Sequence, residues 1–373
     1  MTRLREALGD IAEEAPLVSL ADVAIAGHRH RRRTVLTASA VAVLCVTAAA
    51  VAVVAAVPWP RGARTATQQG QEAVPDLPSG KVGAISRAYM TSCKVVEREA
   101  DCAAVEWRVI TRAGKTYRVP QALAETAKDE RVPVAISRDG RLLAYYSRDA
   151  QAHVVRDLVG GTETTSPVTI KEERIGMGSM LVLSDDGRYI AFDPREGSKY
   201  PGMLIDVRTG RTTPVNGKYE PVSVKGGVAE LVRYRKTDLW LMPVTGGGKP
   251  VRFNGVFIMF SEVAPDGRTV VAFEFPRVGK RESPRLEKST LTLLDAKTGK
   301  TLRKVPISGL PDDRGGVAGT TIWQSESEVT LLYGGKEGER SYAVDVNTGR
   351  VRLLDRQSGR PMNLTYPGAA ASG

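Results

Sequence analysis

The chain has 373 residues, a net charge of +11, three cysteines and three histidines. So few thiols and imidazoles, with no Cys-x-x-Cys, argue against a metal site. The basic residues form no Lys/Arg stripe with interleaved aromatic residues, so a nucleic-acid partner is not indicated either.

Residues 1–33 are predicted to form a cytoplasmic tail. Leu4, Leu8 and Ile11 recur at the spacing of one helical face, which predicts a short amphipathic helix that ends at Pro16. A helix of this length is marginal on its own. The tail therefore either docks on a cytoplasmic partner or is a partly disordered lead that presents arginines.

The next segment, residues 34–57, is uncharged from Val35 onward and is predicted to be a transmembrane helix. As a helix, Val35 to Val57 would extend about 34 Å, compared with a hydrocarbon core of about 30 Å. Small side chains such as Ala38 and Ala42 leave dimerisation through this helix open as a minor alternative.

Basic residues predict the orientation of this helix. The arginines before it are Arg29, Arg31, Arg32 and Arg33, whereas two arginines in a Pro- and Gly-rich stretch follow it. Because cationic residues stay on the cytoplasmic side, the N-terminus is predicted inside and the rest exported at the plasma membrane. A cleaved signal peptide is the alternative, but its apolar region is roughly 7–15 residues long, so a retained signal-anchor is predicted.

Residues 58–81 are rich in Pro, Gly, Gln and Ala, which predicts a linker. From residue 61 onward the chain has 47 Lys and Arg and 37 Asp and Glu, so nearly all excess positive charge lies in the exported part. That sign suits an anionic envelope polymer or lipid headgroups. The simpler interpretation is a solvated, generally basic surface.

Two cysteines, Cys93 and Cys102, lie in the exported part. In an oxidising compartment they are candidates for a disulfide, and their separation fits the two arms of a hairpin. Two free thiols are the alternative.

A recurring motif predicts that residues 82–358 are built from β-hairpins. The motif is an Asp-Gly dipeptide between apolar runs, and it occurs at Asp139-Gly140, Asp186-Gly187 and Asp266-Gly267. Because both residues tolerate the positive φ of a type I′ turn, Asp-Gly between β-rich runs is a strong hairpin signal. Each copy therefore predicts strand, tight turn and strand.

A second hairpin follows each first one, which gives four strands per repeat. Its turns contain Thr-Gly or Gly-Gly, at Thr209-Gly210, Gly246-Gly247, Thr298-Gly299 and Thr348-Gly349. The first-hairpin glycines Gly140, Gly187, Gly227 and Gly267 recur every 40–47 residues. This is the period of propeller blades. We predict about six blades, the first from Ala84 to Pro120, and a flexible C-terminal tail at residues 359–373.

The residues expected between blades are apolar and lie in the predicted strands. They are Val134, Ile136, Leu143, Val182, Ile190, Phe192, Val270, Val271 and Phe273.

Two stretches, Ala264 to Phe273 and Asp238 to Gly247, resemble the TolB-like, WD40-like β-propeller repeat. Its hallmark is Ser/Ala-Pro-Asp-Gly-Arg/Lys, then apolar-Ala-Phe, then a strand that ends in Gly-Gly. The resemblance extends over roughly Val82 to Leu354, although the other copies lack the proline. It implies an all-β propeller, and such propellers mostly bind other proteins. Fold alone does not establish activity.

No motif indicates catalysis, a cofactor or a metal. Gly176-Met-Gly178-Ser179-Met180 departs from the Gly-x-Ser-x-Gly motif of α/β-hydrolases at its last position. Residues 245–249 resemble a phosphate loop but lack its first glycine and its Ser/Thr. His153 is expected to be an ordinary packed or exposed histidine. Acidic pairs such as Asp185-Asp186 and Asp312-Asp313 leave calcium as an alternative, although turn chemistry explains the first pair.

These observations predict a single-pass, N-in membrane protein whose propeller is a non-catalytic binding module at the cell envelope. Its predicted partners are the lipid bilayer and a protein or anionic envelope polymer; the sequence does not predict an oligomeric state. A signalling protein whose tail binds a regulator such as a sigma factor is the alternative. In layout the chain resembles membrane anti-sigma regulators, but its tail lacks the Cys-x-x-Cys of their zinc form. An enzyme that works in the central channel is the third hypothesis.

Overall fold

The computed structural model describes residues 74–373 except 97–98, 103, 198–199, 235, 276–289, 314 and 359–361. The chain divides into two units, residues 1–72 and 73–373. The predicted tail, the predicted transmembrane helix and Arg29, Arg31, Arg32 and Arg33 lie outside the described residues. Among the residues described, no helix is long and apolar enough to span a bilayer.

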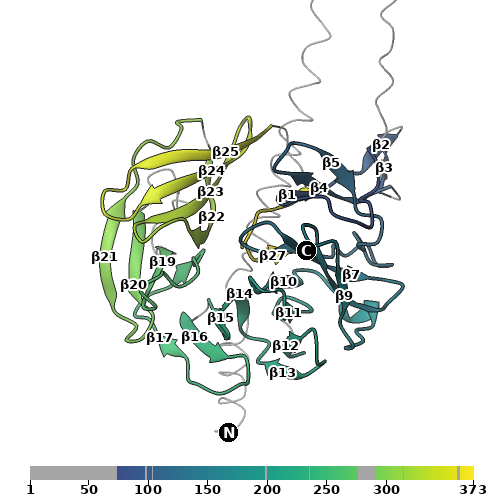
Figure 1. Cartoon of the computed structure of the whole chain (residues 1–373). Helices are drawn as coiled ribbons and strands as arrows, with labels where there is room; N and C mark the ends of the chain where they lie inside the picture. Colours follow the sequence, from purple (N-terminus) through teal and green to yellow (C-terminus); the bar gives the residue numbers. More distant parts are fainter. Residues whose placement is uncertain are drawn as a thin grey trace, which may run out of the picture. The chain divides into compact units, whose positions relative to one another are not determined.

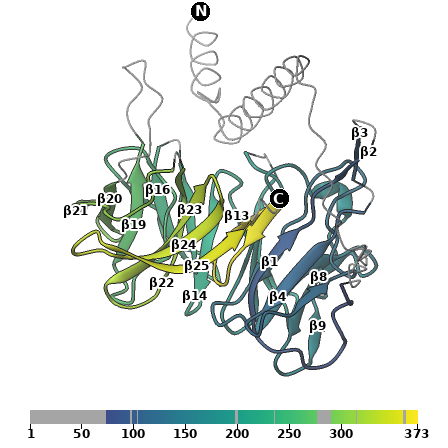
Figure 2. The same ribbon diagram turned by 90° about the horizontal axis from the view of Figure 1, so that it is seen from above.

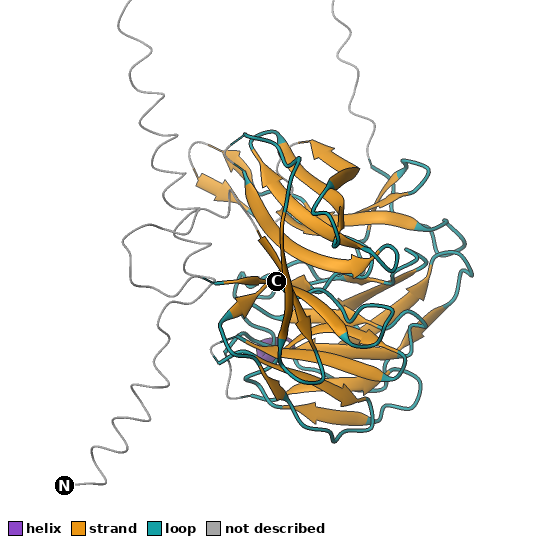
Figure 3. Cartoon of the chain, turned by 90° about the vertical axis from the view of Figure 1, so that its left-hand side faces the viewer, coloured by secondary structure: helices purple, strands orange, loops and turns teal. Residues whose placement is uncertain are grey.

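The described part is an all-β propeller of six blades, apart from one short 3₁₀ helix, η1 (Glu172–Arg174) (Figures 1 and 3). Each blade is one four- or five-stranded sheet. In order from the axis outward, the strands of the first three blades are as follows. Blade 1 contains β26 (Met362–Thr365), β1 (Ile85–Met90), β4 (Trp107–Thr111) and β5 (Thr116–Arg118). Blade 2 contains β6 (Ala135–Ile136), β7 (Leu142–Ser147), β8 (Ala152–Asp157) and β9 (Glu163–Thr165). Blade 3 contains β27 (Ala371–Ser372), β10 (Met180–Leu183), β11 (Tyr189–Asp193), β12 (Gly202–Asp206) and β13 (Thr212–Val215).

The remaining three blades each come from one continuous stretch of sequence. Blade 4 contains β14 (Glu220–Lys225), β15 (Val228–Arg233), β16 (Asp238–Pro243) and β17 (Val251–Arg252). Blade 5 contains β18 (Phe257–Ile258), β19 (Thr269–Glu274), β20 (Thr290–Asp295) and β21 (Thr301–Pro306). Blade 6 contains β22 (Gly316–Trp323), β23 (Glu328–Gly335), β24 (Gly338–Asp345) and β25 (Val351–Ser358). All strand pairs within the blades are antiparallel, as hairpin connections require.

The nine residues predicted between blades are all buried, with exposed fractions of 0–3%. They belong to several apolar clusters that follow one another around the ring; for example, Val182 of blade 3 packs in the same cluster as Val224 of blade 4. The prediction of the core is therefore confirmed. Each small sheet buries its faces against its neighbours because no single blade is large enough to form a core alone.

The C-terminal part of the chain closes the ring. β26 is the inner strand of blade 1, where Thr365 lies opposite Ala88 of β1. Arg87 of β1 also forms an ion pair of 2.5 Å with Asp355 of β25, which joins blade 1 to blade 6. The predicted first unit therefore supplies only three of the four strands of its blade.

The last residues of the chain lie between the inner strands, near the centre of the ring (Figures 1 and 2). β27 pairs with β10, where Leu181 lies opposite Ala371. The Gly368 N–H donates to the Ile136 carbonyl of blade 2 at 2.9 Å. A Cβ atom at Gly368 would lie 2.4 Å from Ile322 of blade 6, so no larger residue fits there.

The prediction of a flexible tail over residues 359–373 was therefore wrong for residues 362–373. Tyr366, Ala369 and Ala371 are each at most 7% exposed. Gly and Ala are concentrated in residues 368–373, and such small residues fit the narrow space between converging inner strands. The predicted linker also extends too far, because the Leu77 N–H donates to the Arg118 carbonyl of β5 at 2.8 Å.

A two-stranded hairpin projects from blade 1. It consists of β2 (Lys94–Val96) and β3 (Glu99–Asp101), which pair in antiparallel register. Cys93 and Cys102 flank this hairpin and form a disulfide with an S–S distance of 2.02 Å. The two cysteines thus lie at the base of a hairpin, in the arrangement that their spacing suggested.

Candidate functional site

The two ends of the blades differ in the connections that they carry. One end, here called the turn face, carries tight hairpin turns such as residues 137–141 between β6 and β7 and residues 184–188 between β10 and β11. The opposite end, the loop face, carries connections such as residues 194–201 between β11 and β12, and the connections between successive blades, which include residues 176–179. The predicted Asp-Gly motifs all lie on the turn face.

The three Asp-Gly turns occupy equivalent positions in blades 2, 3 and 5, but they are not type I′ turns. Gly140, Gly187 and Gly267 have φ values of 66–72°, whereas none of the three preceding aspartates has a positive φ. Their loops are longer, and the aspartate side chain accepts N–H groups of the turn: Asp139 from Arg141 at 3.0 Å, Asp186 from Arg188 at 3.1 Å and Asp266 from Arg268 at 2.8 Å. Two successive left-handed residues occur instead at Gly226 and Gly227, in the two-residue turn of blade 4.

The arginine that follows each Asp-Gly pairs with the aspartate that opens the second hairpin. The ion pairs are Arg141–Asp157 at 2.6 Å, Arg188–Asp206 at 2.9 Å and Arg268–Asp295 at 2.5 Å. Hydrogen bonds from Arg141 hold the pKa of Asp157 at about 2. The repeat motif thus joins the two hairpins of a blade, which is a structural role and leaves these residues engaged within the ring.

Arg138 connects three blades at the turn face. Its guanidinium, from blade 2, pairs with Glu262 of blade 5 and donates to the Trp323 carbonyl of blade 6 at 2.9 Å. The Trp323 N–H also donates to the Glu262 carboxylate at 2.9 Å. Only 6% of the Glu262 side chain is exposed, so this carboxylate depends on these partners.

A group of carboxylates lies at the loop face, where blades 3 and 4 meet. Asp193 ends β11, Glu196 follows in the next loop and Glu220 begins β14. Asp193 is 2% exposed; its Oδ1 accepts the Arg195 N–H at 3.2 Å, and its Oδ2 has no partner among the described residues. Burial, with the charge of Glu196, raises the pKa of Asp193 to about 6. Burial, Glu196 and Asp193 raise the pKa of Glu220 to about 8.

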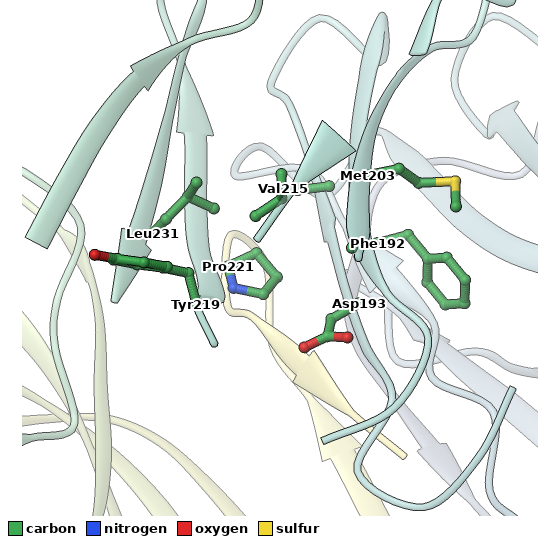
Figure 4. Close-up of a pocket in the computed structure, with 9 residues that line it drawn as sticks. Phe192, Asp193, Met203, Val215, Tyr219, Pro221 and Leu231 are labelled. Atoms are coloured by element: carbon green, nitrogen blue, oxygen red, sulfur yellow. The ribbon is translucent and has the colours of Figure 1, made fainter. Parts of the chain in front are cut away.

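A small cavity adjoins Asp193 between blades 3 and 4 (Figure 4). Its volume is about 10 Å³, about the space for one water, and Val215, Pro221 and Leu231 contribute apolar walls. Figure 4 shows Asp193 on the blade 3 side of this cavity and Pro221 on the blade 4 side. The cavity is far smaller than a small-molecule site of some 300 Å³ or more, so the surface around it is the part that can contact a ligand.

Two large apolar side chains lie in connections of the same loop face, Met177 before β10 and Tyr200 between β11 and β12. Met177 is 57% exposed and Tyr200 is 61% exposed, the highest values among the large apolar residues described. Their loops are joined, because the Gly176 N–H donates to the Pro194 carbonyl at 2.9 Å and the Glu196 N–H to the Met177 carbonyl at 3.2 Å. We call Met177, Asp193, Glu196, Tyr200 and Glu220 the loop-face site. Exposed aromatic and thioether groups are typical of protein recognition surfaces.

A second hollow lies at the turn face between blades 3 and 4. Its volume is about 130 Å³, and it is lined by Arg188, Tyr189, Arg211 and Val244 among others. The Arg188 guanidinium lies 5.0 Å from the ring centroid of Tyr189 and is already paired with Asp206. The Arg188 guanidinium and the Asp206 carboxylate of this hollow are therefore already engaged with each other.

Glu230 is a buried acid in the wall of blade 4, in the apolar run Val228 to Val232 of β15. It is 1% exposed; its carboxyl accepts the Ser223 hydroxyl at 3.0 Å and the Val263 N–H at 2.9 Å, and its Oε1 has no partner among the described residues. Burial raises the pKa of Glu230 to about 8. The group is therefore mostly protonated at neutral pH, because its charged form would lie in a poorly solvated site.

The Glu230→Gln variant is expected to remove part of the pH dependence of stability. Because the folded pKa of about 8 lies above the unfolded value of 4.5, the folded chain retains a proton that the unfolded chain releases, so the free energy of unfolding falls as pH rises from 4.5 to 8. Above pH 8 the free energy of unfolding of the variant should exceed that of the wild type by at least about 1 kcal/mol. Urea unfolding between pH 5 and 9 measures this, with the exposed Glu326→Gln as control; equal slopes for wild type and Glu230→Gln would contradict it.

His153 of β8 is packed between blades 2 and 3. It is 1% exposed and its ring lies edge-on to Tyr146 and Phe192, with centroid distances of 5.8 and 4.6 Å. Burial lowers the pKa of His153 to about 3, so the imidazole is neutral.

The acidic pairs considered for calcium are engaged with arginines. Asp185 lies within 3.7 Å of Arg138, and Asp313 pairs with Arg340 at 3.0 Å. Among the described residues, no group of three or more His, Cys, Asp or Glu side chains is arranged to hold a metal ion.

Neither the loop-face site nor Glu230 was predicted from the sequence. One signal was present for Glu230, since a carboxylate in the middle of an apolar strand run needs a partner or a proton. For Asp193 and Glu220 there was none, because their proximity arises only where blades 3 and 4 pack together.

No protein family model and no curated protein matches the sequence. Among solved structures, the chain is similar to TolB from Acinetobacter baumannii, with 15% identity and a TM-score of 0.48, over 76% of this chain and 66% of that one. It is also similar to the acylaminoacyl peptidase of Pyrococcus horikoshii, with 13% identity and a TM-score of 0.45, over 73% and 46% of the two chains. The β-propeller domain of Cps50 (Swd1) from Myceliophteria thermophila has 14% identity and a TM-score of 0.39, over 64% and 75%.

The chain thus spans just under two thirds of the TolB structure. All three TM-scores are below 0.5, so the likenesses carry no argument about activity. The propeller itself follows from the six sheets and their order.

Proposed function

We propose that the chain is a non-catalytic binding module that recognises a protein partner through the loop-face site. The observation that carries this proposal is the exposure of Met177 and Tyr200, 57% and 61%, in two loops that are hydrogen-bonded to each other through residues 176–177 and 194–196. When a partner buries side chains of this kind, they supply much of the binding free energy of a typical interface. Asp193 and Glu220, beside them, add groups that change charge near neutral pH.

We also propose that the chain is anchored in the plasma membrane. Residues 34–57 would anchor the chain in the plasma membrane, and the arginines at 29 and 31–33 would keep the N-terminus in the cytoplasm. The ring would then face the outside, where its disulfide between Cys93 and Cys102 is chemically stable.

Crosslinking in intact cells tests the binding role. A photoreactive residue at position 177 or 200 is expected to attach to one discrete protein, whereas the same residue at position 159, which is 40% exposed on another part of the ring, should not. With the partner in hand, Met177→Ser/Tyr200→Ala should weaken its binding by about ten- to thirty-fold. Identical crosslinks at all three positions, or unchanged affinity of the double variant, would contradict the proposal.

A further inference from the structure

The outermost strands of blades 5 and 6 differ from those of the other blades. In blades 1 to 4 the outermost strands, β5, β9, β13 and β17, have only two to four residues. In blades 5 and 6 they have six and eight residues, β21 and β25, which lie on the outer side of the ring at the left and upper left of Figure 1. A long exposed edge strand is a liability unless something protects or uses it.

These two strands expose leucines. Leu302 of β21 is 48% exposed, and Leu353 and Leu354 of β25 are 47% and 36% exposed. Three of the six large apolar residues that are exposed in the described structure therefore lie on these two strands. Leu302 and Leu354 each sit where the register with the neighbouring strand shifts, so a bulge presents them.

Cationic side chains surround the leucines. The exposed cations on or just before the two strands are Lys300, Arg303, Lys304, Arg350, Arg352 and Arg356. Two of them are neutralised, since Lys304 pairs with Glu274 and Arg352 pairs with Glu328. The Arg303 guanidinium donates to uncharged oxygens of Val346 and Asn347 at 2.9 Å. We call residues 300–304 and 350–356 the basic rim.

We propose that the basic rim binds the surface of an anionic lipid bilayer. Leucines among cations match such a surface, because the leucines can enter the headgroup region while Arg and Lys reach the lipid phosphates. Bulges and charges on an edge strand also disfavour its pairing with another β-strand, which argues against a partner that adds a strand. The rim thus fits a lipid surface better than it fits a peptide.

This inference rests on the membrane anchor of the proposed function. Residues 58–73 connect the predicted helix to the first described residue, and 16 extended residues span at most about 55 Å. A ring tethered so closely has a high effective concentration at the bilayer, so a weak surface attraction suffices to hold its outer edge there.

The experiment uses the full chain held in phosphatidylcholine nanodiscs, with vesicles added separately. The nanodiscs are expected to float with vesicles that contain phosphatidylglycerol, not with vesicles of phosphatidylcholine alone, and to detach as salt rises. Arg303→Gln/Arg356→Gln should weaken binding by roughly five-fold for each cation removed. Leu353→Ser/Leu354→Ser should also weaken it, whereas the matched control Val159→Ser/Arg208→Gln, on blades 2 and 3, should not.

Flotation that no rim variant changes, or no flotation with anionic vesicles, would overturn the inference. So would a rim that binds an anionic polysaccharide but not vesicles, or rim variants that alter only the oligomeric state in native mass spectrometry. If the chain does not enter nanodiscs, the anchor is wrong, and the free chain is tested with the same vesicles. Absence of crosslinking at positions 177 and 200 would instead contradict the proposed binding of a protein partner. Failure of that proposal is therefore distinguishable from failure of lipid binding by the basic rim.

Discussion

A chain that stops after residue 361 is expected to lose the cooperative thermal unfolding of the full chain. β26 is the inner strand of blade 1, and without it β1 has an open edge at the axis. The truncation also removes the buried side chains of Thr365 and Tyr366, which are 4% and 7% exposed. Loss of a strand and of buried side chains should cost on the order of 5 kcal/mol, which is comparable to the stability of a whole domain.

Circular dichroism and calorimetry measure this effect. A chain that stops after residue 370 is the control, because it keeps β26 and loses only β27, Ala371–Ser372. An Ala88→Cys/Thr365→Cys variant gives the converse test, since these residues lie opposite each other. Its disulfide, which closes a very long loop, should raise the melting temperature under oxidising conditions and lose this gain with a reductant. A truncated chain that melts like the full chain would show that β26 does not close the ring.

Arg138→Met is expected to destabilise the ring by about 2–4 kcal/mol. The substitution leaves the Glu262 carboxylate, only 6% exposed, with the Trp323 N–H and a distant Lys225 ammonium at 4.0 Å. Arg138 itself is 28% exposed and can hydrate when Glu262 is removed. Glu262→Gln should therefore cost less than Arg138→Met, because the amide oxygen can still accept from Trp323.

Urea unfolding of the two single variants and of the double variant separates these contributions. Arg138→Met/Glu262→Gln should be more stable than the sum of the single effects predicts, because no uncompensated charge remains. Arg112→Met, an arginine whose guanidinium donates to the Asp139 carbonyl at an exposed site, is a matched control with an expected effect within about 0.5 kcal/mol. Additive effects of the two variants would contradict the coupling.

Much of the fold could be predicted because its signals are local. The Asp-Gly and Thr-Gly turns, the apolar runs between them and their spacing of 40–47 residues indicate four-stranded blades. The predicted turn type was wrong because a side chain decides the turn: the carboxylates of Asp139, Asp186 and Asp266 accept turn N–H groups, and these aspartates have no positive φ. The predicted flexible C-terminus was wrong because the strands that β26 and β27 pair with, β1 and β10, are remote in sequence and leave no local signal.

The sequence by itself determined the repeat, the blades and their apolar inner strands, since each depends on residues within one hairpin. Only the tertiary structure decided how the ring closes, because Thr365 pairs with Ala88, which lies near the opposite end of the propeller sequence. It alone also brought Asp193 and Glu220 together at the junction of two blades and raised their pKa values, because solvation and charge depend on spatial neighbours. The basic rim depends on both: its residues lie in two short segments of sequence, but the blade order places both segments on outermost strands.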